Sequence, residues 1–121
     1  MPPRRSNPEF LNGVPELLIL RLLDRQPGHG YQLIRRIRLL SDAKLEFGEG
    51  CVYPILHRLE SEGAIRGERK RVNGRSRVVY SITRAGKKRL TATTRHWLDI
   101  VAAVRSVLEG ASDGAPGKNM A

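Results

Sequence analysis

The sequence predicts a mainly α-helical fold with a small β-hairpin, and three observations lead to this prediction. Three apolar segments with helical spacing follow one another, at 15–24, 31–40 and 48–62, and a break with one proline and two glycines, QPGHG at 26–30, separates the first from the second. An Asn-Gly pair at 73–74, typical of a tight hairpin turn, then lies between two segments that form the arms of the hairpin. A long amphipathic segment, 84–109, comes last. This order is that of a winged helix-turn-helix with an added C-terminal helix.

Composition limits the classes of partner open to the chain. Its 121 residues are enough for one domain with a modest core. Lysine and arginine total 22 against 12 for aspartate and glutamate, a formal net charge of +10, so an anionic partner is expected, nucleic acid first. No apolar run approaches the roughly 20 residues that span a bilayer, and the first residues lack the apolar core of a signal peptide. With a single cysteine, Cys51, the chain is expected in the cytoplasm, without a membrane partner.

The first two helices should form the centre of the domain. The first is expected from Pro15 to about Asp24, because a proline in the opening turn gives up an N–H that would be unpaired there anyway. It is apolar around most of its circumference, so it should be central to the core. The inward residues of the second helix, 31–40, are expected to be Leu33, Ile34, Ile37 and Leu40. Its arginines, Arg35 among them, face outward, either to contact phosphate or simply as a solvated surface.

The third helix is the one expected to enter the major groove. It should begin near Gly48 or Glu49, extend to about Glu62 and end at Gly63 as a left-handed cap, with Pro54 in its first turn. Its core-facing residues are Val52, Ile55, Leu56 and Leu59. Small residues at Gly50 and Cys51 allow a close approach to DNA, and Tyr53, His57 and Arg58 are placed to reach phosphates or base edges. Tyr53 packing against the hairpin, and His57 as an ordinary surface histidine, are the alternatives.

The hairpin, with strands at 64–71 and 77–83, is expected to be a phosphate-binding wing. Five cationic side chains crowd around its turn: Arg69, Lys70, Arg71, Arg75 and Arg77. Such crowding is unfavourable by self-repulsion unless a polyanion neutralises it. The complete set of expected DNA-binding residues is Tyr31, Arg35, Gly50, Cys51, Tyr53, His57, Arg58, Lys70, Arg75 and Arg77.

The last helix is expected to make the protein a homodimer. Thr83 is a suitable N-cap for a helix over 84–109. Its larger apolar residues alternate at steps of three and four, with Thr94 filling the gap, as in a coiled-coil seam. The expected dimerisation residues are Leu90, Trp97, Val101, Val104 and Leu108. Two-fold symmetry then places two recognition helices roughly 34 Å apart on an inverted-repeat site.

Trp97 leads to a more specific hypothesis. In the middle of the seam, a pair of tryptophans can flank an opening between subunits and stack a small aromatic ligand. The alternative is that Trp97 only fills the core of the dimer interface.

Catalysis has little support in the sequence. His29, His57 and His96 lie on separate elements without metal-site spacing, and Cys51 lacks an arrangement of acid and base. We therefore expect no enzyme activity, no metal and no cofactor.

The main competitor to a DNA-binding regulator is a winged helix that serves as a protein or RNA interaction module. The ends, 1–9 and 110–121, are expected to be disordered, and 10–83 to form the DNA-binding domain.

Three motifs in a fixed order resemble one known family. They are PGHGYQL before and into the second helix, GxVYPxLHRLExEGxI across the third, and GRSRxxYxITxAGKxxL from the hairpin into the last helix. The chain resembles the PadR family of bacterial transcriptional regulators over about residues 10–108. The resemblance implies a dimeric repressor of palindromic operators, in a family where some members respond to phenolic or multidrug-like aromatic compounds. It is this resemblance that suggests a flat aromatic ligand between the two Trp97 side chains. The short C-terminal part is similar to the subfamily with a single C-terminal helix.

Two residues depart from that family pattern. Cys51 stands where serine or threonine is usual, so the resemblance implies that a hydroxyl bond to phosphate is absent here or replaced by a weak thiol contact. Val79 stands where a second aromatic often precedes Tyr80. This change thins the packing behind the wing and leaves its arginines in place.

Overall fold

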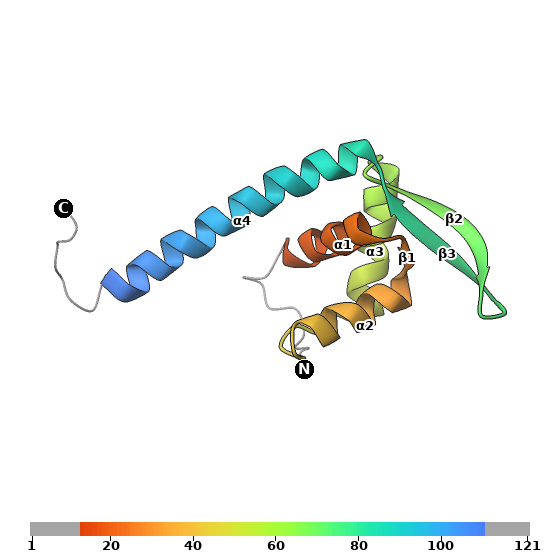
Figure 1. Ribbon diagram of the computed structural model, residues 1–121, viewed down its shortest axis with the longest axis horizontal. Coiled ribbons are helices and arrows are strands. Elements are labelled where there is room, and N and C mark those ends of the chain that lie inside the picture. Colours follow the sequence, from red (N-terminus) through yellow and green to blue (C-terminus); the bar gives the residue numbers. More distant parts are fainter. Residues whose placement is uncertain (1–12, 111–121) are drawn as a thin grey trace. The chain divides into compact units, whose positions relative to one another are not determined.

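The computed structural model describes residues 13–110 and confirms a mainly helical fold with a small antiparallel sheet. The elements in order are α1 (Val14–Arg25), β1 (Gly28–His29), α2 (Gly30–Leu40), α3 (Glu49–Ser61), β2 (Ile65–Val72), β3 (Arg75–Ile82) and α4 (Arg84–Gly110) (Figure 1). The chain falls into two units, Met1–Leu90 and Thr91–Ala121, and we describe each by itself. The disorder expected for residues 1–9 and 110–121 concerns residues outside the described range, with one exception. Gly110 is described, and it is the last residue of α4.

Helix α1 lies at the centre of the first unit, as its apolar sequence predicts. Its buried residues are Val14, Pro15, Leu17, Ile19, Leu20, Leu22 and Leu23. They are joined in the core by Leu33 and Ile37 of α2, Phe47 of the following loop, and Val52, Leu56 and Leu59 of α3. The inward placement expected for Leu40 is wrong: it is 68% exposed, because it is the last residue of α2 and borders an open hollow instead of the core. Ile34 and Ile55 are half-buried.

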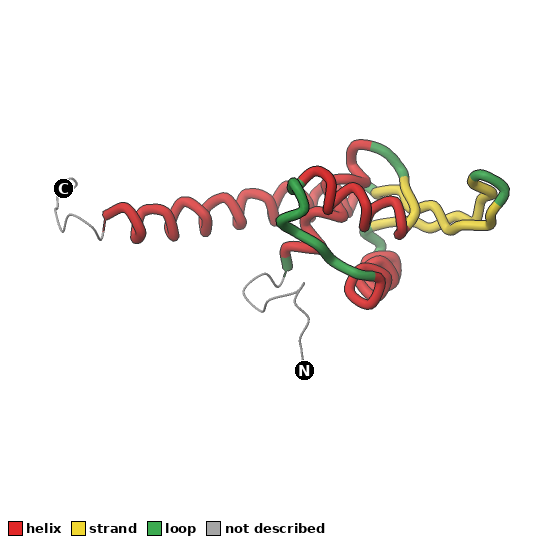
Figure 2. The backbone as a smooth tube through the Cα atoms, turned by 90° about the horizontal axis from the view of Figure 1, so that it is seen from below, coloured by secondary structure: helices red, strands yellow, loops and turns green. Residues whose placement is uncertain are grey.

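The sheet has three strands in the order β1-β3-β2, all antiparallel. The turn between β2 and β3 consists of Asn73 and Gly74 alone, with φ of 52° and 80°. Both residues therefore lie in the left-handed region that a two-residue type I′ turn requires. The strands accordingly extend closer to the turn than expected, and the hairpin projects away from α1, α2 and α3 (Figures 1 and 2).

The short strand β1 was not expected, since residues 26–30 were interpreted only as a break. Gly28 pairs with Tyr80 and His29 pairs with Val79. Two residues are too few to show an alternating pattern, so sequence alone gives no sign of the strand. The pairing has a structural consequence, because it attaches the beginning of α2 to the base of the wing.

The junction between α3, β2 and α4 is closely packed. Gly63, at φ 79°, ends α3 as predicted, and the N–H of Ala64 donates to the carbonyl of Leu59 at 2.9 Å. The hydroxyl of Thr83 accepts from the N–H of Gly86 at 3.1 Å, the N-cap expected from the sequence, and donates to the carbonyl of Gly63 at 2.6 Å. A Cβ at Gly86 would overlap the carbonyl oxygen of Ala64. The first turn of α4 is therefore fixed against this turn.

Candidate nucleic-acid interface

The outward face of α3 carries small side chains except at His57. Val52, Leu56 and Leu59 are buried, and the positions on the opposite side of the helix are exposed: Gly50, Pro54, His57 and Ser61. A Cβ at Gly50 would meet no atom within 4 Å. Nothing within the described residues therefore prevents this face from approaching another molecule closely.

Pro54 is inside α3, not in its first turn, so the expectation for this residue is wrong. The helix begins at Glu49, which makes Pro54 its sixth residue. A proline there lacks the N–H that would donate to the carbonyl of Gly50, four residues earlier. Because Pro54 is exposed, this gap in the helical hydrogen bonding lies on the outward face.

Tyr31 connects α2 with the wing. Tyr31 is 46% exposed, with the guanidinium carbon of Arg35 at 5.8 Å from the centre of its ring and that of Arg77 at 5.9 Å. Both distances are within the range of a cation–π interaction. The structure thus brings Tyr31, Arg35 and Arg77 together, although they come from different elements.

Tyr53 and His29 lie beside this group at the start of α2. The ring of Tyr53 is half-buried and covers Gly30, where an added Cβ would be 2.6 Å from two ring carbons. Its packing partner is therefore α2, which neither the groove nor the hairpin interpretation of Tyr53 anticipated. His29 is the N-cap of α2: its Nδ1 accepts from the N–H of Gln32 at 3.3 Å, and the Gln32 side chain accepts from the N–H of His29.

The protonation state of His29 follows from its surroundings. Burial, and secondly the positive charge of Arg77, lower the pKa of its imidazole. A neutral imidazole is also what the cap requires, because a protonated Nδ1 cannot accept a hydrogen bond. Sequence reasoning missed this residue, and the spacing of His29 and Gln32 is the signal that would have found it.

Three of the expected wing residues share one face of the hairpin. Lys70 of β2 lies directly opposite Arg77 of β3, and Arg75 is two residues before Arg77, so the alternation of strand residues places all three on the same side. Because Arg77 is beside Tyr31, this face adjoins α2. The only carboxylate paired with these three cations among residues 13–110 is that of Glu68, 3.9 Å from Lys70. Like charges directly opposite each other destabilise a hairpin, so this face favours an anionic partner.

Arg69 and Arg71, the other two cations near the turn, lie on the opposite face of the hairpin and bind within the wing. Arg69 donates to the hydroxyl of Ser76 at 3.2 Å, and Arg71 donates to the carbonyl of Gly74 at 2.7 Å. The five cationic residues, which looked equivalent in the sequence, thus form two groups. One group stabilises the turn, and the other faces α2.

Arg58 is separate from the Tyr31 group. Its guanidinium donates to Glu16 of α1 at 2.7 Å and to Glu62 at 3.4 Å, while Arg89 of α4 donates to the same carboxyl of Glu62 at 2.8 Å. The hydrogen bond from Arg89, with the charges of both arginines, lowers the pKa of Glu62. These ion pairs connect α1, α3 and the first turns of α4, so the charge of Arg58 is already matched within the chain.

Cys51 does not have the environment of a reactive thiol. It is half-buried near the start of α3, and burial raises the pKa of its thiol. A neutral thiol is a weak nucleophile and a weak hydrogen-bond donor. Among residues 13–110, no group of histidine, cysteine, aspartate or glutamate side chains is arranged to hold a metal ion, and no described helix is long and apolar enough to cross a membrane.

The second unit, beginning at Thr91, contains the rest of α4 and carries an apolar stripe. Its members at steps of three and four are Trp97, Ile100, Val101, Val104, Val107 and Leu108. Val104 is 52% exposed and Leu108 71%, whereas Trp97 and Val101 are half-buried. Leu90, expected in the same seam, is only 6% exposed and is buried within its own chain. The available stripe therefore begins at Trp97.

A helix with an exposed face, followed by a hairpin whose cations on one side have a single acidic partner among residues 13–110, defines a winged helix-turn-helix protein of the nucleic-acid-binding class. Within this class, the chain belongs to the Transcriptional regulator PadR-like family, whose family model matches residues 19–92. It is a transcriptional regulator and not an enzyme.

Known relatives agree with this assignment over most of the chain. The chain is 36% identical over 107 residues to the transcriptional regulator Rv3488 of Mycobacterium tuberculosis, an alignment that covers 88% of this chain and 94% of the relative. A PadR-like transcriptional regulator from Bacillus cereus has a similar solved structure, with a TM-score of 0.74 and 29% identity, covering 85% of this chain and 99% of the other. A transcriptional regulator from Clostridium thermocellum shares the fold, with a TM-score of 0.76 at 24% identity, over 82% and 97% of the two chains.

Proposed function

We propose that the protein is a dimeric repressor that binds inverted-repeat operators in double-stranded DNA. In this proposal α3 enters the major groove through its face at Gly50, Pro54 and His57, and the wing lies along the phosphate backbone. Base edges are contacted from α3, whereas Tyr31, Arg35, Lys70, Arg75 and Arg77 contact phosphates. The repressor role rests on the resemblance to the family.

The observation that carries the proposal is the position of the Tyr31 group. Tyr31 has one arginine from α2 and one from the wing within 6 Å of its ring, and three cations of the wing, Lys70, Arg75 and Arg77, lie on the face that adjoins α2. Positive charges from two elements are held together with few acidic partners. This arrangement supports a continuous phosphate-binding surface beside the small outward face of α3.

Tyr53, Cys51 and Arg58 have supporting positions in the proposal. Tyr53 fixes the start of α2 by covering Gly30, and its proposed contact with DNA is by the part of the half-buried side chain that stays exposed. Cys51 contributes a small side chain near the helix N-terminus. Arg58 stays a predicted contact, but its ion pairs with Glu16 and Glu62 favour a structural role.

Dimerisation is supported by the apolar stripe of α4. Trp97, Val101, Val104 and Leu108 follow the alternation of a coiled-coil seam, and the last two are more than half exposed in a single chain. Burying this stripe against a second copy removes it from water. Leu90 is left out of the proposed interface because its own chain already buries it.

Release by a small aromatic ligand at Trp97 is the remaining part of the proposal. Trp97 is half-buried and is the single tryptophan of the chain, so its fluorescence reports on this position alone. Titration with planar aromatic compounds should change that fluorescence if the ligand stacks on Trp97. An unchanged signal would leave Trp97 with the role of filling the dimer interface.

Selection of bound sequences from a random pool of DNA duplexes tests the DNA-binding part. The expected result is an inverted repeat with its half-sites one helical turn apart, bound far more tightly than a scrambled duplex of the same length. Equal affinity for all duplexes would favour the alternative, a winged helix that serves as a protein or RNA interaction module.

A further inference from the structure

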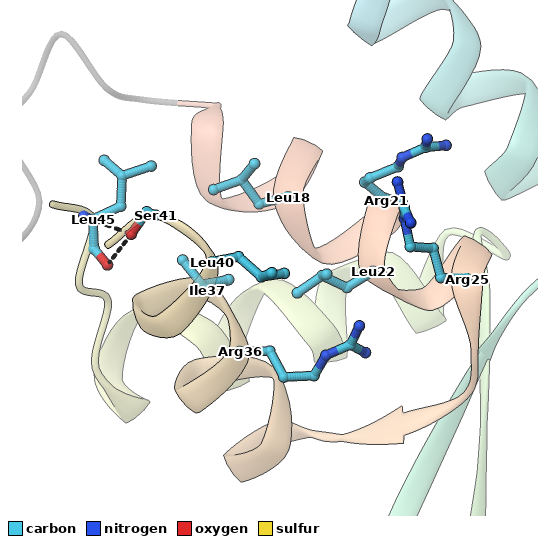
Figure 3. Close-up of a pocket in the computed structure, with 9 residues that line it drawn as sticks. All are labelled: Leu18, Arg21, Leu22, Arg25, Arg36, Ile37, Leu40, Ser41 and Leu45. Carbon is cyan, nitrogen blue, oxygen red and sulfur yellow. Dashed lines mark hydrogen bonds between the residues drawn. The ribbon is translucent and has the colours of Figure 1, made fainter. Parts of the chain in front are cut away.

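A hollow between α1 and α2 has no part in the proposed DNA interface. Its volume is about 340 Å³, at the small end of the range of small-molecule sites. Five aliphatic side chains line it: Leu18 and Leu22 of α1, Ile37 and Leu40 of α2, and Leu45 of the following loop (Figure 3). The large exposed fraction of Leu40, 68%, is a consequence of this opening.

The charged residues of the hollow are all arginines. Arg21 and Arg25 come from the last turns of α1 and Arg36 from α2. In Figure 3 the side chains of Arg21 and Arg25 lie together, and that of Arg36 lies on the other side of Leu22, all three away from Leu45. Arg21 has a carboxylate partner, Asp24, at 3.5 Å. Arg25 and Arg36 form no ion pair with any residue of 13–110. Unmatched positive charge on both sides of Leu22, in the lining of an apolar hollow, is complementary to an anion that carries an apolar group.

The uncharged polar group of the hollow is already satisfied. The hydroxyl of Ser41 accepts from the N–H of Leu45 at 3.0 Å and lies 3.2 Å from the carbonyl of the same residue (Figure 3). It holds the loop after α2 in place. Selectivity in this hollow therefore depends on the arginines and on the aliphatic lining.

We propose that the hollow binds an amphipathic monocarboxylate, with its carboxylate between Arg25 and Arg36 and its hydrocarbon part along Leu22, Ile37 and Leu40. The carboxylate supplies the charge that the two arginines lack, and the hydrocarbon covers apolar surface that is now open to water. A cation with the same hydrocarbon part is excluded by the arginines. Trp97 is not among the residues that line this hollow.

Binding of the carboxylate in the hollow can regulate DNA binding. This regulatory part of the inference rests on the proposed function. Helix α2 carries Arg36, Ile37 and Leu40 on the side of the hollow, and it also carries Tyr31 and Arg35 of the DNA interface. A ligand held between α1 and α2 that favours one position of α2 changes how Tyr31 and Arg35 are presented. We expect the carboxylate to lower the affinity for the operator.

The test is a titration of the full chain with decanoate. Binding is measured by calorimetry and by the changes in the NMR methyl signals of Ile37 and Leu40. Decyltrimethylammonium is the control for charge, and acetate is the control for the hydrocarbon part. Arg25→Gln combined with Arg36→Gln should weaken decanoate binding about tenfold, whereas Arg66→Gln combined with Arg84→Gln, exposed arginines outside the hollow, should leave it within about twofold. Leu40→Ser, at an exposed position that folding does not need, should weaken binding about threefold.

The outcomes separate the possibilities. Equal binding of decanoate and decyltrimethylammonium, or equal affinities in all variants, would overturn the proposal. No decanoate binding, together with weaker self-association of the Leu40→Ser variant in sedimentation, would identify the hollow as a subunit contact and would also overturn it. Decanoate binding without any effect on operator affinity would refute the regulatory part alone. Failure of the protein to bind any operator would refute the proposed function but leave the decanoate titration interpretable.

Discussion

Neutralising the α2-facing side of the wing should reduce the salt dependence of DNA binding. The perturbation is Arg75→Gln combined with Arg77→Gln, which removes two cations from the face that also carries Lys70. The matched control is Arg69→Gln combined with Arg71→Gln. It removes the same charge from the same hairpin, but from side chains bonded to Ser76 and to the carbonyl of Gly74.

The magnitude follows from counterion release. Each phosphate contact contributes about 0.9 to the slope of log affinity against log salt, so losing two contacts per chain, or four per dimer, should reduce that slope by about 3.6. Raising the salt from about 50 to about 200 mM weakens DNA binding by both proteins. The fold-loss of affinity should be about 150 times smaller for the variant than for the unaltered protein. The stability of the fold should change by less than about 1 kcal/mol, because Arg75 is exposed and the lost cation–π contact between Arg77 and Tyr31 is offset by relief of the repulsion between Arg77 and Lys70.

Fluorescence anisotropy with a labelled duplex at a series of salt concentrations measures both slopes. The control variant should keep a slope close to that of the unaltered protein, since its arginines are engaged within the wing. The reasoning is refuted if the two variants lose the same slope, because the division of the wing into two faces would then have no meaning for DNA.

Three further predictions concern stability and assembly. Gly86→Ala should lower the free energy of unfolding in urea by about 1–3 kcal/mol, because its Cβ overlaps the carbonyl of Ala64; Gly50→Ala, in open space, should instead raise it by up to about 1 kcal/mol. The melting temperature should fall as the pH drops below 6.5, the ordinary pKa of histidine, because the pKa of His29 is lowered in the folded state and the unfolded chain takes up the proton first. His29→Ser keeps a capping acceptor and should lessen this dependence, and an unchanged pH profile would exclude His29 as its source. Trp97→Ala should weaken self-association about tenfold or more in sedimentation equilibrium, and an intact dimer would contradict the proposed seam.

Local signals in the sequence were sufficient where a feature depends on a few adjacent residues. The Asn73-Gly74 turn, the left-handed Gly63 and the Thr83 cap were all predicted and all confirmed. Each depends on backbone geometry that few residue types allow. The helices followed from apolar spacing over ten or more residues, a pattern that chance rarely produces.

Features that depend on distant contacts could not be predicted. The strand β1 exists because Gly28 meets Tyr80. The exposure of Leu40 and the burial of Leu90 depend on where the neighbouring elements end, not on their own spacing.

The candidate DNA-binding residues show the same limit. The sequence identified the cationic residues of the wing, but it gave no indication that Arg69 and Arg71 bind within the wing while Lys70, Arg75 and Arg77 face α2. The pairing of Arg58 with Glu16, 42 positions away, and the covering of Gly30 by Tyr53 are contacts between separate helices. Sequence patterns indicate which residues are outward, and only the fold shows which of them are already occupied.

The most direct measurement of the central claim compares three duplexes of equal length in one binding assay. The first carries both selected half-sites one helical turn apart, the second carries a single half-site, and the third has the half-sites displaced by about five base pairs, half a turn. If two chains present their α3 helices to one face of DNA, the first duplex should bind two chains with by far the highest affinity. Equal affinity for all three, or one chain per duplex throughout, would contradict the account.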